Sequence, residues 1–271
     1  MSFDPVALGY LLGATGPVTV ASEEELNWEN AAALLLNESY FLYPGYEEQD
    51  LFFASAASSI FDAVKCGQAD TMALITAMSR AIDERRLNLW SADPVEQEFI
   101  ATTPMAGILP VDNVETPAVG VYFNDDSSAK LAYYLDTAIS ITSDQCTNAT
   151  PSMHGTVTLV NNSPAAAATS LPEYMRGSWY RLGVIMMDPV VYGPVGGGLG
   201  GFAINGAAVA PEYLGSHLGR SAAKIRFHMS PGETAVVDYD MTGLEGEYGP
   251  IDVRQTPMVR PTQAAIATPG W

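Results

Sequence analysis

Basic residues are scarce in this chain. Its 271 residues include 12 lysines and arginines against 31 aspartates and glutamates, which gives a formal net charge of -19 at pH 7. Only Lys65, Lys130 and Lys224 are lysines. Nucleic acids and anionic membranes need a basic surface whose cations displace counterions from phosphates. The composition therefore excludes both as partners bound by general electrostatics and favours a neutral, cationic or metal-bridged partner.

Long apolar runs are also missing. No stretch reaches the roughly 18 apolar residues that span a bilayer, so the sequence predicts no membrane-spanning helix. Met1–Leu12 lacks both the basic residues and the small-residue cleavage site of a signal peptide. Because a helical pattern begins directly after Asp4, we expect the sequence to start within a longer gene product whose upstream part is missing.

Cysteine is nearly absent. Cys66 and Cys146 lie too far apart in the sequence for a metal knuckle or a redox pair. One disulfide between the two halves of the chain and two separate buried thiols are both compatible with this spacing, and we slightly favour separate thiols.

The first half has the pattern of a helix-rich domain, predicted over residues 1–116. Hydrophobic residues make up 48% of the chain and charged residues only 16%, which is typical of a globular protein. Asp4-Pro5, Asp70 and Asp93-Pro94 are helix starts, because a carboxylate caps free amide groups and proline suits the first helical position. The expected apolar stripes are Phe53, Ala57, Ile60, Phe61 and Val64 in one helix and Met72, Ile75, Met78 and Ile82 in the next.

The second half, residues 117–271, has the pattern of short strands separated by Gly, Pro and Asn clusters. Ser230–Glu233 is predicted to be a hairpin turn and Gly193–Gly206 a long loop or a loop with a short strand, while Tyr133 and Tyr134 are placed on opposite faces of one strand. Several short strands without helices between them favour an antiparallel, immunoglobulin-like β-sandwich. The predicted fold class is therefore α+β.

Motifs that carry chemistry are weak. Gly196–Gly201 matches the dinucleotide fingerprint, but no helix pattern follows it to receive a pyrophosphate. His154, His217 and His228 stand alone without a second ligand at metal-binding spacing. No Gly-x-Ser-x-Gly elbow is present. The sequence therefore predicts no catalytic residue, no cofactor and no metal centre.

Two sets of residues remain as candidate binding groups. Asp125 and Asp126 are either a turn or a weak cation site. Aromatic rings gather in one short segment and suit either packing between the two halves or a platform for a ligand or an interface, because they bury a large area at small entropic cost. These rings belong to Trp28, Tyr40, Phe41, Tyr43 and Tyr46.

Several short motifs are distinctive in combination. They are Asp4-Pro5-Val6-Ala7-Leu8, Thr15-Gly16-Pro17-Val18-Thr19-Val20, Trp28-Glu29-Asn30-Ala31-Ala32, Asp83-Glu84-Arg85-Arg86 with Trp90-Ser91-Ala92-Asp93-Pro94, and Ser170-Leu171-Pro172-Glu173-Tyr174. With these motifs the chain resembles a domain-of-unknown-function family of actinobacterial cell-surface proteins. The resemblance implies an extracellular, envelope-associated location, an anchor upstream of this sequence, and an envelope polymer or protein as the partner.

The segments Asp4–Val20 and Asn30–Leu36 also resemble the LytR-CpsA-Psr enzymes, which transfer glycopolymers from a polyprenyl pyrophosphate carrier. That chemistry needs arginines to neutralise the pyrophosphate, and no arginine lies between Met1 and Ser79. We therefore do not assign the transferase activity to this chain. Two hypotheses follow: a non-catalytic extracellular module for surface interaction or envelope assembly, and a glycopolymer phosphotransferase whose basic residues lie in missing upstream sequence.

Overall fold

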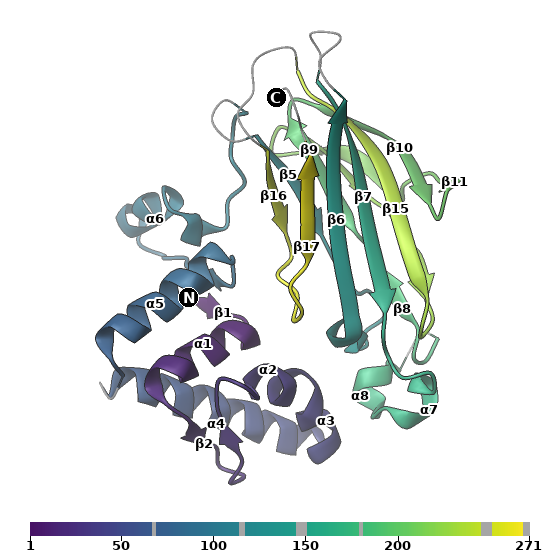
Figure 1. Ribbon diagram of the computed structural model, residues 1–271. Helices are drawn as coiled ribbons and strands as arrows, with labels where there is room; N and C mark the ends of the chain where they lie inside the picture. The colour runs from purple at the N-terminus through teal and green to yellow at the C-terminus, as the bar shows by residue number, and fades with distance from the viewer. Residues whose placement is uncertain (67–68, 114–116, 145–150, 179–180, 245–250, 268–271) are drawn as a thin grey trace. The chain divides into compact units, whose positions relative to one another are not determined.

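The chain folds into two compact units, Met1–Ile108 and Leu109–Trp271. The structure is a computed structural model that describes all residues except 67–68, 114–116, 145–150, 179–180, 245–250 and 268–271. Helices are concentrated in the first unit and strands in the second, so the fold is mixed α and β (Figure 1).

Three N-caps predicted from the sequence are confirmed. Asp4 accepts a hydrogen bond from the amide of Ala7 at 2.8 Å and begins α1 (Pro5–Thr15), which ends at Gly16 with φ 89°. Asp70 caps α5 (Thr71–Asp83) and Asp93 caps α6 (Pro94–Ala101) in the same way. Each carboxylate satisfies an amide that the first turn leaves unpaired, which fixes where the helix begins.

The remaining elements of the first unit are short, apart from one long helix. Residues 40–42 are helical, and the helix ends at Tyr43. These elements are α4 (Tyr46–Lys65), α2 (Ala31–Ala33), the π-helix η1 (Leu34–Glu38), α3 (Ser39–Leu42), the 3-10 helix η2 (Pro104–Ala106), and the strand pairs β1 (Ser2–Phe3) with β4 (Leu87–Asn88) and β2 (Val18–Thr19) with β3 (Glu25–Leu26).

The predicted apolar stripes of α4 and α5 are confirmed only in part. In α4 Ile60 is buried as expected, but Phe52 and Ala56 are buried in place of Phe53 and Ala57, and the ring of Phe52 stacks on Tyr43 with centroids 5.1 Å apart. In α5 Met78 and Ile82 pack against the core as expected, but the fully buried residues are alanines 77 and 81, and Met72 is 68% exposed. Since α5 packs on α1, small residues on its inner face allow the two helices to approach closely.

The second unit contains two large sheets. The six-stranded sheet has the order β11-β10-β15-β7-β6-β17 and the five-stranded sheet the order β12-β13-β9-β5-β16, while β8 and β14 form a separate pair. The strands are β5 (Ala118–Tyr122), β6 (Leu135–Asp144), β7 (Ser152–Asn161), β8 (Ile185–Met187), β9 (Val190–Val195), β10 (Gly198–Ile204), β11 (Ala207–Ala208), β12 (Tyr213–His217), β13 (Arg220–Lys224), β14 (Phe227–Met229), β15 (Thr234–Thr242), β16 (Asp252–Gln255) and β17 (Gln263–Ala267), and the short helices are η3 (Leu131–Tyr134), α7 (Ala167–Ser170) and α8 (Glu173–Arg176).

The two large sheets lie close to each other, since β9 of one contacts β10 and β15 of the other (Figure 1). Side chains along β7 and β15 alternate between buried and exposed, as expected for strands with one face on a core. The expectation of a wholly antiparallel arrangement is wrong at two edges, because β16 pairs in parallel with β5, and β17 pairs in parallel with β6.

Three local predictions in this unit are also wrong. The glycine-rich stretch is mostly strand: β9 and β10 flank a turn in which Gly196 has φ 69°, a left-handed conformation that favours glycine. Tyr133 and Tyr134 lie in the 3-10 helix η3, so they are not on one strand. The turn at 230–233 joins β14 and β15, which belong to different sheets, and is therefore no hairpin.

Arg220 fastens the start of the second unit. Its guanidinium is only 1% exposed and donates hydrogen bonds to the carbonyl oxygens of Ala118 at 2.6 Å and Gly193 at 3.1 Å, and also to that of Pro110. Asn113 pairs with both backbone groups of Val195. The segment 109–113 therefore belongs to the sheet unit, and the boundary between the units precedes the predicted division after residue 116.

We expect the Arg220→Ala variant to lower the free energy of unfolding of the second unit by about 3 kcal/mol, because three buried carbonyl groups lose their donor and a cavity opens. Urea denaturation of the full chain, followed by circular dichroism, measures this change. The exposed Arg181 provides the matched control, since Arg181→Ala should change the stability by less than about 0.5 kcal/mol. A loss below about 1 kcal/mol for Arg220→Ala would contradict the assigned role.

Candidate functional site

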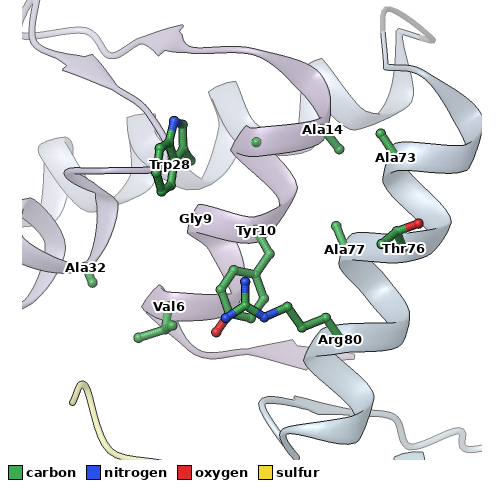
Figure 2. A pocket seen from close by; sticks show the side chains of 11 residues that line it. Val6, Gly9, Tyr10, Ala14, Trp28, Ala32, Ala73, Thr76, Ala77 and Arg80 are labelled. Carbon is green, nitrogen blue, oxygen red and sulfur yellow. The ribbon is translucent and has the colours of Figure 1, made fainter. Parts of the chain in front are cut away.

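An apolar groove crosses the surface of α1 in the first unit. Its volume is about 560 Å³, and small residues of α1, α2 and α5 form much of its lining. Figure 2 shows Trp28 on one side of α1 and α5 with Arg80 on the other. The small residues are Gly9, Gly13, Ala14, Ala32, Ala73 and Ala77.

Trp28 forms one side of the groove, and hydrogen bonds of the side chains of Asn27 and Asn30 fix the loop that carries it. The side-chain oxygen of Asn27 accepts hydrogen bonds from the amides of Glu29 and Asn30, and the side-chain oxygen of Asn30 accepts one from the amide of Asn27 at 2.8 Å. A Cβ atom on Gly9 would lie 3.3 Å from the carbonyl oxygen of Trp28, so glycine lets this loop lie close to α1 without a small displacement. The indole itself remains 66% exposed.

Arg80 and Tyr10 form the polar end of the groove. The guanidinium carbon of Arg80 lies 3.9 Å from the centre of the Tyr10 ring, within the range of a cation–π interaction. Glu84 holds both groups, because it accepts hydrogen bonds from the Tyr10 hydroxyl at 2.6 Å and from Arg80 Nε at 2.8 Å. Although burial alone raises it, hydrogen bonds from Tyr10, Arg80 and Arg86 lower the pKa of Glu84 below its usual value.

Arg86 fixes the two helices at this end. Its buried guanidinium donates to Asp4 at 2.6 Å and to Glu84 at 2.8 Å, and its carbonyl oxygen accepts from the amide of Asp4. The start of α1 is thus joined to the end of α5. The two guanidinium groups of Arg80 and Arg86 face the two carboxylates of Asp4 and Glu84, so this cluster is formally neutral.

The groove offers mainly N–H donors. The hydroxyl protons of Tyr10 and Thr76 are already donated, to Glu84 and to the carbonyl oxygen of Met72. The terminal nitrogens of Arg80 form no hydrogen bond with any residue that the structure describes, and Trp28 adds an indole N–H. An aromatic face beside free donors suits non-covalent binding of a ring that carries a hydrogen-bond acceptor.

The aromatic residues singled out in the sequence lie in different surroundings. Only Trp28 lines the groove. Tyr40 is buried with its ring 6.1 Å from that of Phe53, and Tyr43 is stacked on the core and bonded to Glu24. Phe41 and Tyr46 are exposed. The structure therefore does not gather these five rings around one groove.

Asp125 and Asp126 are occupied by different partners. Asp125 accepts hydrogen bonds from the amide and the hydroxyl of Ser127, and burial raises the pKa of this carboxyl. Asp126 pairs with Arg226 at 2.7 Å, and Arg226 also pairs with the buried Asp188. Within the described ranges, no three His, Cys, Asp or Glu side chains are arranged to hold a metal ion.

Sequence reasoning missed the residues that complete the groove. The spacing of Arg80 and Glu84, four residues apart on one helix, indicates an ion pair, but nothing local places Tyr10 beside it. Of the two cysteines, Cys66 is an exposed free thiol, and Cys146 lies outside the described residues. None of the described helices combines the length and the apolar character needed to cross a bilayer.

Comparison with known proteins gives few matches. Residues 1–40 match the profile of a family described as "Protein of unknown function (DUF4012)", which supports the resemblance to a family of unknown function over the first three motifs. No curated protein matches the chain. One solved structure, of a Legionella pneumophila protein whose description assigns it to nutrient binding, aligns with 14% identity and a TM-score of 0.19 over 49% of this chain and 45% of that chain. A similarity at that level carries no argument about fold or function.

His154 lies between two carboxylates on the six-stranded sheet. Its Nδ1 is 2.8 Å from Asp240, and its Nε2 is 3.4 Å from Asp238. The hydrogen bond to Asp240, opposed by partial burial and supported by both negative charges, raises the pKa of His154 above its usual value of 6.5. Protonated His154 therefore stabilises the fold below about pH 6.5, and this contribution is lost as the pH rises through the higher folded-state pKa.

We expect an NMR titration to give a pKa above 6.5 for His154, which the His154→Gln variant identifies among the three histidine signals. Replacement of Asp240 by Asn should move this pKa down, because the principal acceptor loses its charge. A pKa at or below 6.5 in the unmodified protein, or no change on replacing Asp240, would contradict the assigned contact.

Proposed function

We propose that this protein is a non-catalytic extracellular module of the cell envelope, and that it binds a neutral envelope polysaccharide through the groove beside Trp28. The observation that supports this best is an indole that is 66% exposed over a cavity of about 560 Å³. Exposed tryptophan is costly to leave in water, and its flat face matches the C–H face of a pyranose ring. The groove is large enough for a small number of sugar rings.

The charge of the protein favours a neutral polymer. At a net charge of -19, a polyanionic chain would be repelled as it comes within about one Debye length of the surface, roughly 8–10 Å at moderate salt. The neutral cluster at the polar end of the groove adds no excess positive charge to offset that repulsion. A glycan without acidic groups approaches this surface without such a penalty.

The location and origin remain part of the proposal. They rest on the resemblance of the motifs to actinobacterial cell-surface proteins and imply an anchor outside this sequence. The LytR-CpsA-Psr-like nature of the first unit and the immunoglobulin-like nature of the second belong to the same proposal. In this scheme the first unit contacts the polymer and the second serves surface interaction or envelope assembly.

A transferase of the LytR-CpsA-Psr type is the second candidate, because Arg80 lines the groove and Arg86 lies behind it. The ion pairs with Glu84 and Asp4 argue against it, since both guanidinium groups are already neutralised and a diphosphate would face carboxylates. Turnover of a polyprenyl-pyrophosphate sugar with magnesium, abolished by Arg80→Ala, would favour the transferase over the binding module.

We expect Trp28→Ala to reduce binding to purified cell-wall polysaccharide by at least about tenfold, because aromatic anchors in a binding groove contribute about 2 kcal/mol or more. Trp90→Ala is the matched control: Trp90 is 70% exposed but does not line the groove, so its loss should leave binding unchanged. A pull-down with the insoluble polymer and titration with soluble fragments measure both. Equal binding by the two variants would refute the proposed site.

A further inference from the structure

We infer that the groove selects N-acetylated sugars, with the acetamido carbonyl accepting hydrogen bonds from Arg80 while the sugar ring stacks on Trp28. This inference rests on the proposed function and specifies its ligand class. It begins from the hydrogen-bonding groups that remain available in the groove after the contacts within the protein are made.

Arg80 is fixed before any ligand arrives. Its Nε is bound to Glu84 at 2.8 Å and its guanidinium lies over the ring of Tyr10, with 3.9 Å between the guanidinium carbon and the ring centre. The described residues provide no partner for its terminal N–H groups, and Figure 2 shows the guanidinium between α1 and α5. The side chain therefore presents donors in one orientation, and binding orders little that is not already ordered.

A carbonyl oxygen satisfies these donors better than a hydroxyl group. A sugar hydroxyl that accepts from Arg80 still has its own proton to place, and only the oxygens of Thr76 and Tyr10 remain among the lining side chains to receive it. An amide carbonyl only accepts, so it leaves nothing unpaired at this end of the groove. The N–H of the acetamido group can point back to solvent.

The carboxylates of the cluster formed by Asp4, Arg80, Glu84 and Arg86 favour a neutral amide over a negatively charged carboxylate as the ligand's acceptor. An acidic sugar also offers an acceptor, but it would lie close to Glu84, whose charge already compensates Arg80. The Asp4–Arg86 pair adds no net charge. A neutral acceptor gains the hydrogen bond to the guanidinium without the repulsion from Glu84 and from the acidic surface.

The lining also provides a place for the acetyl methyl group. Ala73 and Ala77 line the same side of the groove as Arg80, two turns and one turn before it on α5, respectively. A methyl group is small enough to lie against alanine side chains, and its transfer from water is favourable by about 0.8 kcal/mol. Plain hexoses carry a hydroxyl at this position and gain no such contact.

The test compares soluble oligosaccharides of equal length by isothermal titration calorimetry on the full chain. The probes are the tetramer of N-acetylglucosamine, the tetramer of glucose with the same linkage, and a tetramer of a uronic acid. We expect the N-acetylated tetramer to bind about tenfold or more tightly than the glucose tetramer, which is the range of one hydrogen bond to a charged donor.

Three variants test whether the preference for the N-acetylated tetramer comes from the donors of Arg80. Arg80→Met keeps the aliphatic stem but removes the donors, so it should bring the N-acetylated tetramer to the affinity of the glucose tetramer. Lys65→Met removes an exposed cation outside the groove and should change neither affinity. Trp28→Ala should weaken all probes alike. Circular dichroism confirms that each variant is folded.

The outcomes separate this inference from the proposed function. Equal affinity for the N-acetylated and glucose tetramers, with both lost in Trp28→Ala, would overturn the inference and leave the polysaccharide site intact. Tighter binding of the uronic acid tetramer would overturn the inference and the argument from charge. Binding of no tetramer, together with no binding of the wall polymer, would overturn both.

Discussion

The groove depends on one buried guanidinium. Arg86 bonds Asp4 at the start of α1 and Glu84 at the end of α5, and so sets the separation of the two helices at one end. Removing such a charge would leave Asp4 without its guanidinium partner and Glu84 with only Tyr10 and Arg80, at two partly buried carboxylates, which is more costly than losing a surface ion pair. Glu84, held from this side, in turn orients Tyr10 and Arg80. The contacts therefore connect the Asp4–Arg86 pair, through Glu84, to Tyr10 and Arg80, the groups that a ligand in the groove would meet.

Because basic residues are scarce, it matters where the few arginines lie. With 12 cations for the whole chain, several lie at junctions instead of on the solvated surface. Arg86 joins two helices, Arg220 gathers three backbone carbonyl groups at the start of the second unit, and Arg226 ties Asp188 to Asp126. The negative charge on the protein is therefore poorly compensated at the surface. That favours solubility and a neutral partner, and it makes each of these arginines hard to replace.

Helix starts could be predicted because their signals lie within one turn, whereas helix packing and strand pairing depend on residues far apart in the sequence. The caps at Asp4, Asp70 and Asp93 were predictable because a carboxylate and the amides that it caps lie within one turn. The inner face of α5 was not, since close packing on α1 selects alanine over the larger Met72 and Ile75. The parallel pairing of β16 with β5 and of β17 with β6 was missed because pairing between remote segments leaves no periodic trace. In the groove, sequence reasoning found Trp28, whereas Tyr10 and Arg80 meet only through the tertiary fold.

The contrast between Trp28 and the other aromatic residues shows why exposure alone does not define a site. Phe41 and Tyr46 are also exposed, but they do not line the groove. Trp28 differs because its backbone is fixed by Asn27 and Asn30 and lies against a glycine of α1. A fixed backbone reduces the freedom that Trp28 loses when a ring stacks on it, and Glu84 and Tyr10 hold Arg80 through contacts that a ligand does not replace. Both sides of the groove are thus ordered in advance by groups behind them, which is the physical condition for selective binding of a small neutral ring.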